Sequence, residues 1–157
     1  MKTREELRKQ LIENRLMQDY EETELFEEAM NKLYEENNLE NIKYYCEAFD
    51  DSTGHYEVMF EMIHGIENYD QVFTPEKATE KLINSVQYFN SNSKEWQEVL
   101  FLRIINNPTS RELLKNLLII CYDKESKKFI IGILKRIIER NRAKFEENVN
   151  YVLTRIS

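Results

Sequence analysis

The sequence contains few of the residues that build turns. Its 157 residues include only three glycines and two prolines. This scarcity argues against a fold of many short strands, which needs frequent turns. No apolar run approaches the roughly 18 residues of a membrane span, and the N-terminal residues 1–10 lack the apolar core of a signal peptide. The sequence therefore predicts a soluble, cytoplasmic protein that makes no membrane contact.

Motifs that carry chemistry are also scarce. Glu61 and His64 form one Glu-x-x-His step, but the helical di-iron sites that use this step need a second one. Neither cysteine lies near a histidine, and no glycine-rich phosphate loop is present. We therefore expect no catalytic residue, no metal and no cofactor, and we expect His64 to be hydrogen-bonded at the edge of the core.

The two cysteines, Cys46 and Cys121, each lie in an apolar helical pattern. This position is typical of a buried, reduced thiol, because free cysteine behaves as a small hydrophobic residue. A structural disulfide between the two is the alternative. The prediction is that both thiols are free and buried.

Charge is abundant and unevenly distributed. The net charge is −7, but residues 17–80 contain 18 acidic and 3 basic residues, a net charge of −15. Residues 81–157 contain 8 acidic and 14 basic residues, a net charge of +6. The acidic segment would repel nucleic acid and attract a basic protein. The composition, 41% hydrophobic and 11% aromatic, supports one folded domain over residues 1–157.

Apolar residues recur at helical spacing through most of the chain, which predicts about eight helices. Thr74 and Pro75 mark one helix start, and Thr109 with Glu112 has the spacing of a capping box. Whether the last region is one helix or breaks near Asn141 stays open. The predicted ranges are 3–17, 19–37, 39–49, 55–68, 74–89, 94–106, 109–121 and 125–154.

Short connections between these helices make neighbours antiparallel. The spacing of the helical pairs is close to that of HEAT-type repeats, although no exact sequence repeat is present. The predicted fold is therefore all-α, an array of antiparallel helical hairpins that is HEAT-like. A closed helical bundle is the alternative.

The helix predicted over 55–68 is expected to lie at the centre of the molecule, because it is apolar over most of its circumference. Met59, Ile63 and Ile66 should be among the most buried residues. The turn at residues 50–54 precedes this helix and is expected to cap it. One polar stripe remains on the helix, formed by Glu57, Glu61, His64 and Asn68.

The turn and the stripe together define a candidate partner-binding surface. Its predicted members are Asp50, Asp51, Glu57, Glu61 and His64. In one alternative the two aspartates are only helix caps, and in another the whole acidic surface is merely solvated. The reason to expect a binding role is the acidic excess. Like-charge repulsion between these residues weakens folding, so a function would explain why they are present.

Three further residues are predicted to be structural. Arg103 follows Trp96 along an apolar face and is expected to be buried, so its guanidinium needs a carboxylate partner. Glu67 and Asp70 are the candidates, because both lie at the end of the central helix. We favour this cross-helix pair over a direct contact between Arg103 and a ligand.

Several short motifs in residues 40–108 together resemble the bacterial immunity protein 30 family. They are Phe49-Asp50-Asp51-x-Thr53, Glu57-Val58-Met59, Ile63-His64-x-Ile66-Glu67, Trp96 and Arg103-Ile104-x-Asn106. Gly65 departs from the expected pattern and indicates closer helix packing at that point.

The resemblance implies an all-helical cytoplasmic protein, encoded beside a polymorphic or contact-dependent toxin, that neutralises the toxin by direct binding. It implies no catalytic residue and no cofactor. The partner would be the C-terminal domain of the cognate toxin, and the acidic segment leads us to expect a basic one. An acidic helical adaptor or a nucleic-acid mimic is the alternative.

Overall fold

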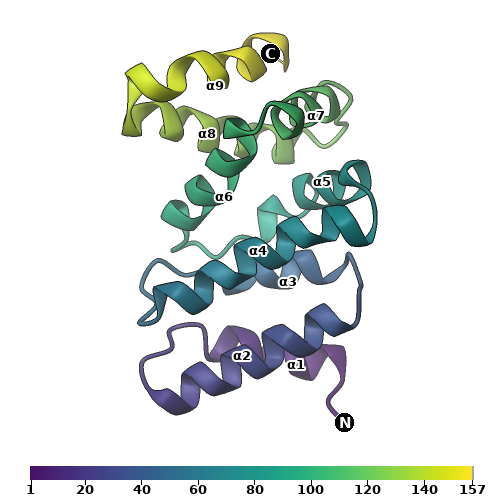
Figure 1. Cartoon of the computed structure of the whole chain (residues 1–157), viewed down its shortest axis with the longest axis vertical. Helices are drawn as coiled ribbons and strands as arrows, with labels where there is room; N and C mark the ends of the chain where they lie inside the picture. The colour runs from purple at the N-terminus through teal and green to yellow at the C-terminus, as the bar shows by residue number, and fades with distance from the viewer. Residues whose placement is uncertain (157) are drawn as a thin grey trace.

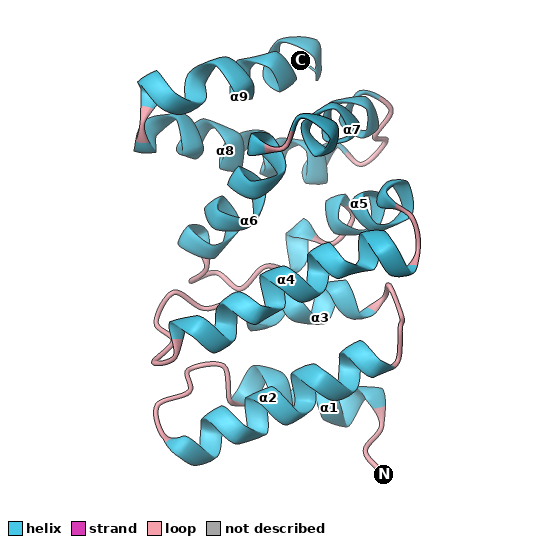
Figure 2. Cartoon of the chain, in the orientation of Figure 1, coloured by secondary structure: helices cyan, strands magenta, loops and turns pink. Residues whose placement is uncertain are grey.

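The computed structural model describes residues 1–156, and this range contains helices and loops but no strand (Figure 2). The all-α prediction is therefore confirmed. The elements are α1 (Arg4–Glu13), α2 (Tyr20–Glu35), α3 (Asn41–Ala48), α4 (Tyr56–Val72), α5 (Pro75–Ile83), the 3-10 helix η1 (Val86–Tyr88), α6 (Lys94–Asn106), α7 (Pro108–Ile119), α8 (Lys124–Arg140) and α9 (Arg142–Ile156).

The helices stack along the long axis of the molecule, from α1 and α2 at one end to α8 and α9 at the other (Figure 1). The first two pack on each other, α1 also contacts α3, and α2 contacts α4. At the far end α8 and α9 pack together and against α6, and α9 also covers α7. The HEAT-like character of this stack stays a prediction. Within residues 1–156, no helix is both long enough and apolar enough to cross a bilayer.

Two predicted helical regions each hold more than one element in the structure. The one expected over 74–89 ends at Ile83 and is followed by η1. The region 125–154 holds two helices, α8 and α9, separated by Asn141, whose backbone is extended (φ −162°, ψ 91°). The first helix is shorter than predicted, because α1 ends at Glu13.

The helix starts follow local capping chemistry. Thr74 caps α5 as predicted, since its side chain accepts a hydrogen bond from the Lys77 amide. The capping box expected at Thr109 is wrong, because Pro108 occupies the first position of α7 and Asn107 accepts from the Ser110 amide instead. A proline at that position costs no hydrogen bond, so the helix begins earlier than the threonine spacing suggested.

Helix α4 runs through the middle of the stack, as Figure 1 shows. Met59 and Ile63 are fully buried and Ile66 is 4% exposed, which confirms the predicted core positions. Each of these side chains loses its apolar surface to the core shared by the neighbouring helices. Burial of such side chains stabilises a fold by about 1.5–3 kcal/mol each.

Gly65 allows α2 to approach α4 closely. A Cβ atom added at this glycine would lie 1.8 Å from the Tyr34 ring and hydroxyl of α2. The Tyr34 hydroxyl donates to the Met62 carbonyl at 3.2 Å, and its ring lies 4.8 Å from that of Tyr45. The closer packing predicted at Gly65 is therefore present, and any larger residue at this position would require the Tyr34 ring to move.

Both cysteines are free thiols, but only one is buried. Cys46 is fully buried in α3, and this burial raises the pKa of its thiol. The predicted burial of Cys121 is wrong, because α7 ends at Ile119 and Cys121 lies half-exposed in the connection to α8.

Candidate functional site

The turn at residues 50–54 is a junction inside the fold. The Asp50 side chain is only 4% exposed, and one carboxylate oxygen accepts from Arg15 Nε at 2.8 Å. The other oxygen accepts from the Ser52 amide and from Asn92 Nδ2. The Asp50 carbonyl accepts from the indole N–H of Trp96 at 3.1 Å. Asp50, which follows α3, therefore joins the connection after α1 to the first turn of α6, and its carboxylate is not presented to solvent.

Asp51 also bonds within the fold. Its carboxylate accepts from the backbone amides of Glu95 and Trp96, in the first turn of α6. The cap expected for the following helix is therefore wrong: α4 has His55 at its N-cap and no side-chain capping bond. The aspartate instead caps a helix that begins more than 40 residues later, where the positive end of the helix dipole stabilises its charge.

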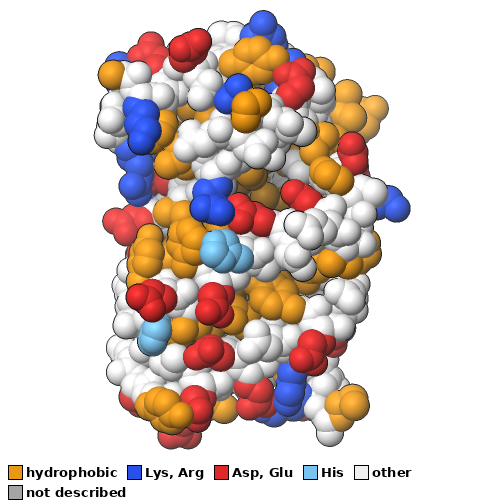
Figure 3. Space-filling view, in the orientation of Figure 1, with side chains coloured by type: hydrophobic (Ala, Val, Ile, Leu, Met, Phe, Trp, Pro, Cys, Tyr) orange, Lys and Arg blue, Asp and Glu red, His pale blue; other side chains and the backbone are white. Residues whose placement is uncertain are grey.

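Glu57, Glu61 and His64 lie together on the exposed face of α4. Within residues 1–156 neither glutamate has a cationic partner within 4 Å, and His64 makes no hydrogen bond. The expected hydrogen bond of His64 is thus not present, and its ring packs edge-on against Phe60 at 5.0 Å instead. Acidic side chains continue below this stripe, over α2 (Figure 3).

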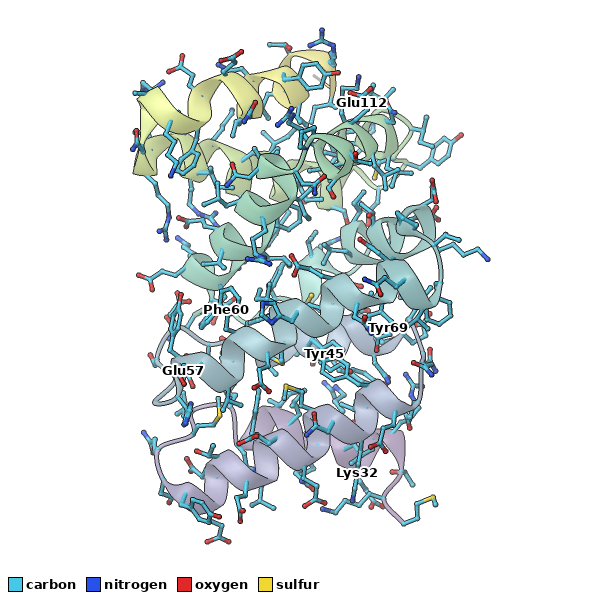
Figure 4. All side chains as sticks on the ribbon, viewed as in Figure 1. Lys32, Tyr45, Glu57, Phe60, Tyr69 and Glu112 are labelled. Carbon is cyan, nitrogen blue, oxygen red and sulfur yellow. The ribbon has the colours of Figure 1, made fainter. Side chains whose placement is uncertain are left out.

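Two aromatic residues border the stripe, and the sequence analysis did not select them. Tyr56 is 56% exposed, and its ring packs on that of Trp96 at 4.3 Å. Phe60 is half-buried on the side of α4 that faces α6, while Glu57 lies near the N-terminal end of α4 (Figure 4). The i, i+4, i+8 spacing of Tyr56, Phe60 and His64 is the signal that would have found them. We call Tyr56, Glu57, Phe60, Glu61 and His64 the α4 surface.

Trp96 holds the α4 surface from beneath. Its ring is 1% exposed and contacts Phe49, Tyr56 and Phe60 at centroid distances of 5.9, 4.3 and 6.1 Å. Because its indole N–H bonds to Asp50, the tryptophan is fixed by the 50–54 turn. The two predicted halves of the site are thus connected, with the turn inside and the stripe outside.

Arg103 pairs with Glu67, the first of the two partners predicted. The guanidinium donates to both carboxylate oxygens, at 2.7 and 3.1 Å, and lies 5.4 Å from the centre of the Phe60 ring. The hydrogen bond with Glu67 raises the pKa of Arg103. The expected burial of Arg103 is wrong: its side chain is 42% exposed, because α6 and α4 meet at the surface there.

Asp70 lies one turn beyond Glu67 and has a different environment. It lines a small cleft with the apolar residues Ile66, Leu100 and Ile104. Desolvation raises the pKa of Asp70 to about 6, with smaller contributions from the charges of Glu67 and Glu76. Within residues 1–156 no set of three or more His, Cys, Asp or Glu side chains is placed to hold a metal ion.

The fold and this site define a small all-α protein that presents an acidic and aromatic surface on a buried central helix. The model of one family, described as Immunity protein 30, matches residues 13–114. The chain therefore belongs to the immunity protein 30 family, which implies an immunity protein directed against a toxin. A search of curated proteins and a search of solved structures gave no significant match.

Proposed function

We propose that this protein neutralises a cognate toxin of a polymorphic or contact-dependent inhibition system by direct binding. In this proposal the α4 surface contacts a basic C-terminal domain of the toxin. The observation that carries it is that Glu57 and Glu61 lack cationic partners within residues 1–156 and lie beside the exposed Tyr56. Family membership supports a toxin as the partner.

Charge explains why a basic domain fits. Residues 17–80 carry a net charge of −15, and the exposed carboxylates of α4 lie within that segment. A toxin domain that cleaves nucleic acid needs cationic groups for the phosphate backbone. An acidic inhibitor steers such a domain into encounter and competes for the same cationic groups.

The aromatic residues supply a second kind of contact. Tyrosine and arginine are enriched among the residues that dominate interface energies, and an arginine stacks well on an aromatic ring. Arg103 shows this arrangement within the chain, because it lies over Phe60 and pairs with Glu67. In this proposal a toxin arginine stacks on the exposed Tyr56 ring, and the carboxylates of Glu57 and Glu61 supply negative charge on the neighbouring face of α4.

The predicted site residues divide into two groups. Glu57, Glu61 and His64 are contact residues, whereas Asp50 and Asp51 support the surface from within the fold. Neutralisation requires only that the toxin be covered, so we propose no enzymatic activity and no cofactor. The site of action is the cytoplasm, where an incoming toxin would meet its target.

The test uses the cognate toxin C-terminal domain, which the proposal expects to be encoded directly upstream of this gene. We expect co-expression of the immunity protein to restore growth and calorimetry to show a stoichiometric complex. The Glu57→Gln, Glu61→Gln double variant should bind more weakly than the Glu125→Gln, Glu147→Gln control, which changes the net charge equally at two exposed C-terminal carboxylates. A wild-type chain that neither binds nor protects would overturn the proposal.

A further inference from the structure

An exposed apolar patch lies at the end of α7, far along the chain from the α4 surface. Ile119, Ile120 and Tyr122 are 47%, 65% and 98% exposed. We call these three residues the Tyr122 patch. Hydrophobic side chains are visible at the right-hand edge of Figure 3, at the height of α7. Adjacent exposed apolar residues of this size mark interaction sites more often than isolated ones.

The backbone under the patch is held in place at both ends. The Asp123 carboxylate accepts from the Glu125 and Ser126 amides at the start of α8 and from Gln87 Nε2. The Cys121 amide donates to the Leu118 carbonyl at the end of α7. The backbone that carries Tyr122 is therefore held by hydrogen bonds on either side.

Beside the patch the surface is hollowed between α5 and the end of α7. The apolar lining comes from Ile83, Leu117 and Ile120, with Cys121 and Tyr122 at the edge. Glu80 also lines the hollow, and Lys124 directly follows the lining residue Asp123. Within residues 1–156, both Glu80 and Lys124 are exposed and have no ion-pair partner.

We propose that a second copy of this chain covers the Tyr122 patch in a two-fold dimer. In a two-fold contact each copy offers both halves of every interaction, so Tyr122 of one copy enters the hollow of the other, and Glu80 faces Lys124. The patch carries the self-complementary set that this symmetry needs: a protruding aromatic, an apolar hollow, one unpaired carboxylate and one unpaired ammonium group. Asp123 adds a second carboxylate to the hollow, but its oxygens are already engaged by the Glu125 and Ser126 amides and by Gln87.

Sedimentation equilibrium of the full chain tests the dimer directly. Between about 1 and 500 μM, a range that includes micromolar interface affinities, the weight-average mass should rise from monomer toward dimer. Tyr122→Ser should weaken dimerisation at least about tenfold, the loss of one well-packed anchor. Tyr88→Ser is the matched control, because Tyr88 is 49% exposed but lies outside the patch. A monomer at every concentration, or equal dimerisation of Tyr122→Ser and wild type, would overturn the proposal.

The native thiols provide a second measurement. Cys46 is buried, so alkylation by excess maleimide reports on Cys121 at the edge of the hollow. The labelling rate should fall as the protein concentration rises in wild type and stay constant in Tyr122→Ser. If the chain is monomeric and Tyr122→Ser instead weakens binding of the toxin domain, the patch belongs to the toxin interface and the dimer is refuted. Neither result depends on the role of the α4 surface.

Discussion

Two pairs of carboxylates lie within a stretch of twelve residues, and one pair is bonded inside the fold while the other is exposed to solvent. Asp50 and Asp51 point into the fold, where one pairs with Arg15 and the other caps α6. Glu57 and Glu61 point to solvent and have no cationic partner within residues 1–156. The inward pair lies on a turn packed between three helices, and the outward pair lies on the exposed stripe of one. Charge alone therefore does not define a binding surface, because the local backbone decides which carboxylates remain available.

Among these carboxylates, Asp50 is expected to contribute most to the free energy of unfolding. Asp50→Ala should lower the free energy of unfolding by about 3 kcal/mol, because it leaves Arg15 and the Ser52 amide without their buried acceptor. Urea unfolding followed by circular dichroism measures the change. A loss below about 0.5 kcal/mol, the usual range for surface substitutions, would show that Asp50 belongs with the outward pair.

Asp51 should give a smaller loss. Asp51→Ala removes the acceptor of two amides in the first turn of α6, and losing such a cap costs about 0.5–2 kcal/mol. Asp51→Asn should retain most of the stability, since its side-chain oxygen still accepts. The same urea titration separates the two variants, and equal stability of Asp51→Ala and wild type would remove the capping role.

Asp70 lies between the two extremes, because it is half-buried and has no cationic partner within 4 Å among residues 1–156. Its pKa of about 6 lies above the ordinary carboxyl value of 3.8, so the folded state binds more protons than the unfolded state between these values. The contribution of the Asp70 carboxyl to the free energy of unfolding is therefore lost as the pH rises from 3.8 through 6. Asp70→Asn should stabilise the fold by about 1 kcal/mol at pH 7.5, after allowance for solvent screening, and by nothing near pH 3.5. Thermal unfolding at both pH values is the measurement, and a pH-independent difference would contradict it.

The outward pair should have the smallest effect on stability. Glu57→Gln with Glu61→Gln should change the free energy of unfolding by less than about 0.5 kcal/mol, because neither carboxylate has a cationic partner to lose in the described part of the chain. Association with the toxin domain should nevertheless slow about tenfold at low salt, and the difference from wild type should shrink as salt is raised. Stopped-flow fluorescence gives the rate. Destabilisation comparable to that of Asp51→Ala would place these glutamates in the fold instead.

The parts of the site that follow helical periodicity could be predicted from the sequence. The buried positions Met59 and Ile63 and the exposed stripe through Glu57 and Glu61 follow from a period of 3.6 residues. The pairing of Arg103 with Glu67 was also predicted, because a cation beside apolar residues needs a carboxylate. The exposure of the Arg103 side chain was not predicted, because it depends on where α4 and α6 meet in the tertiary structure.

Contacts across long sequence separations could not be predicted. Asp51 caps α6 and not α4 because the stack brings the 50–54 turn against a helix that begins at Lys94. No local pattern distinguishes a cap for the next helix from a cap for a distant one. Cys121 looked buried because its neighbours are apolar, but α7 ends two residues earlier and leaves those neighbours at the surface. The end of a helix without glycine or proline gives no strong signal in the sequence.

The contact between Gly65 and Tyr34 fixes the separation of α2 and α4. The ring fills the space where a side chain would lie, and its hydroxyl is bonded to the Met62 carbonyl. This contact holds the two acidic helices at one separation. A partner that bridged both would lose no conformational entropy in aligning them, and it would have to match a set spacing of carboxylates. If the proposed partner contacts both helices, the absence of a Cβ atom at Gly65 would thus set the carboxylate spacing that the partner has to match.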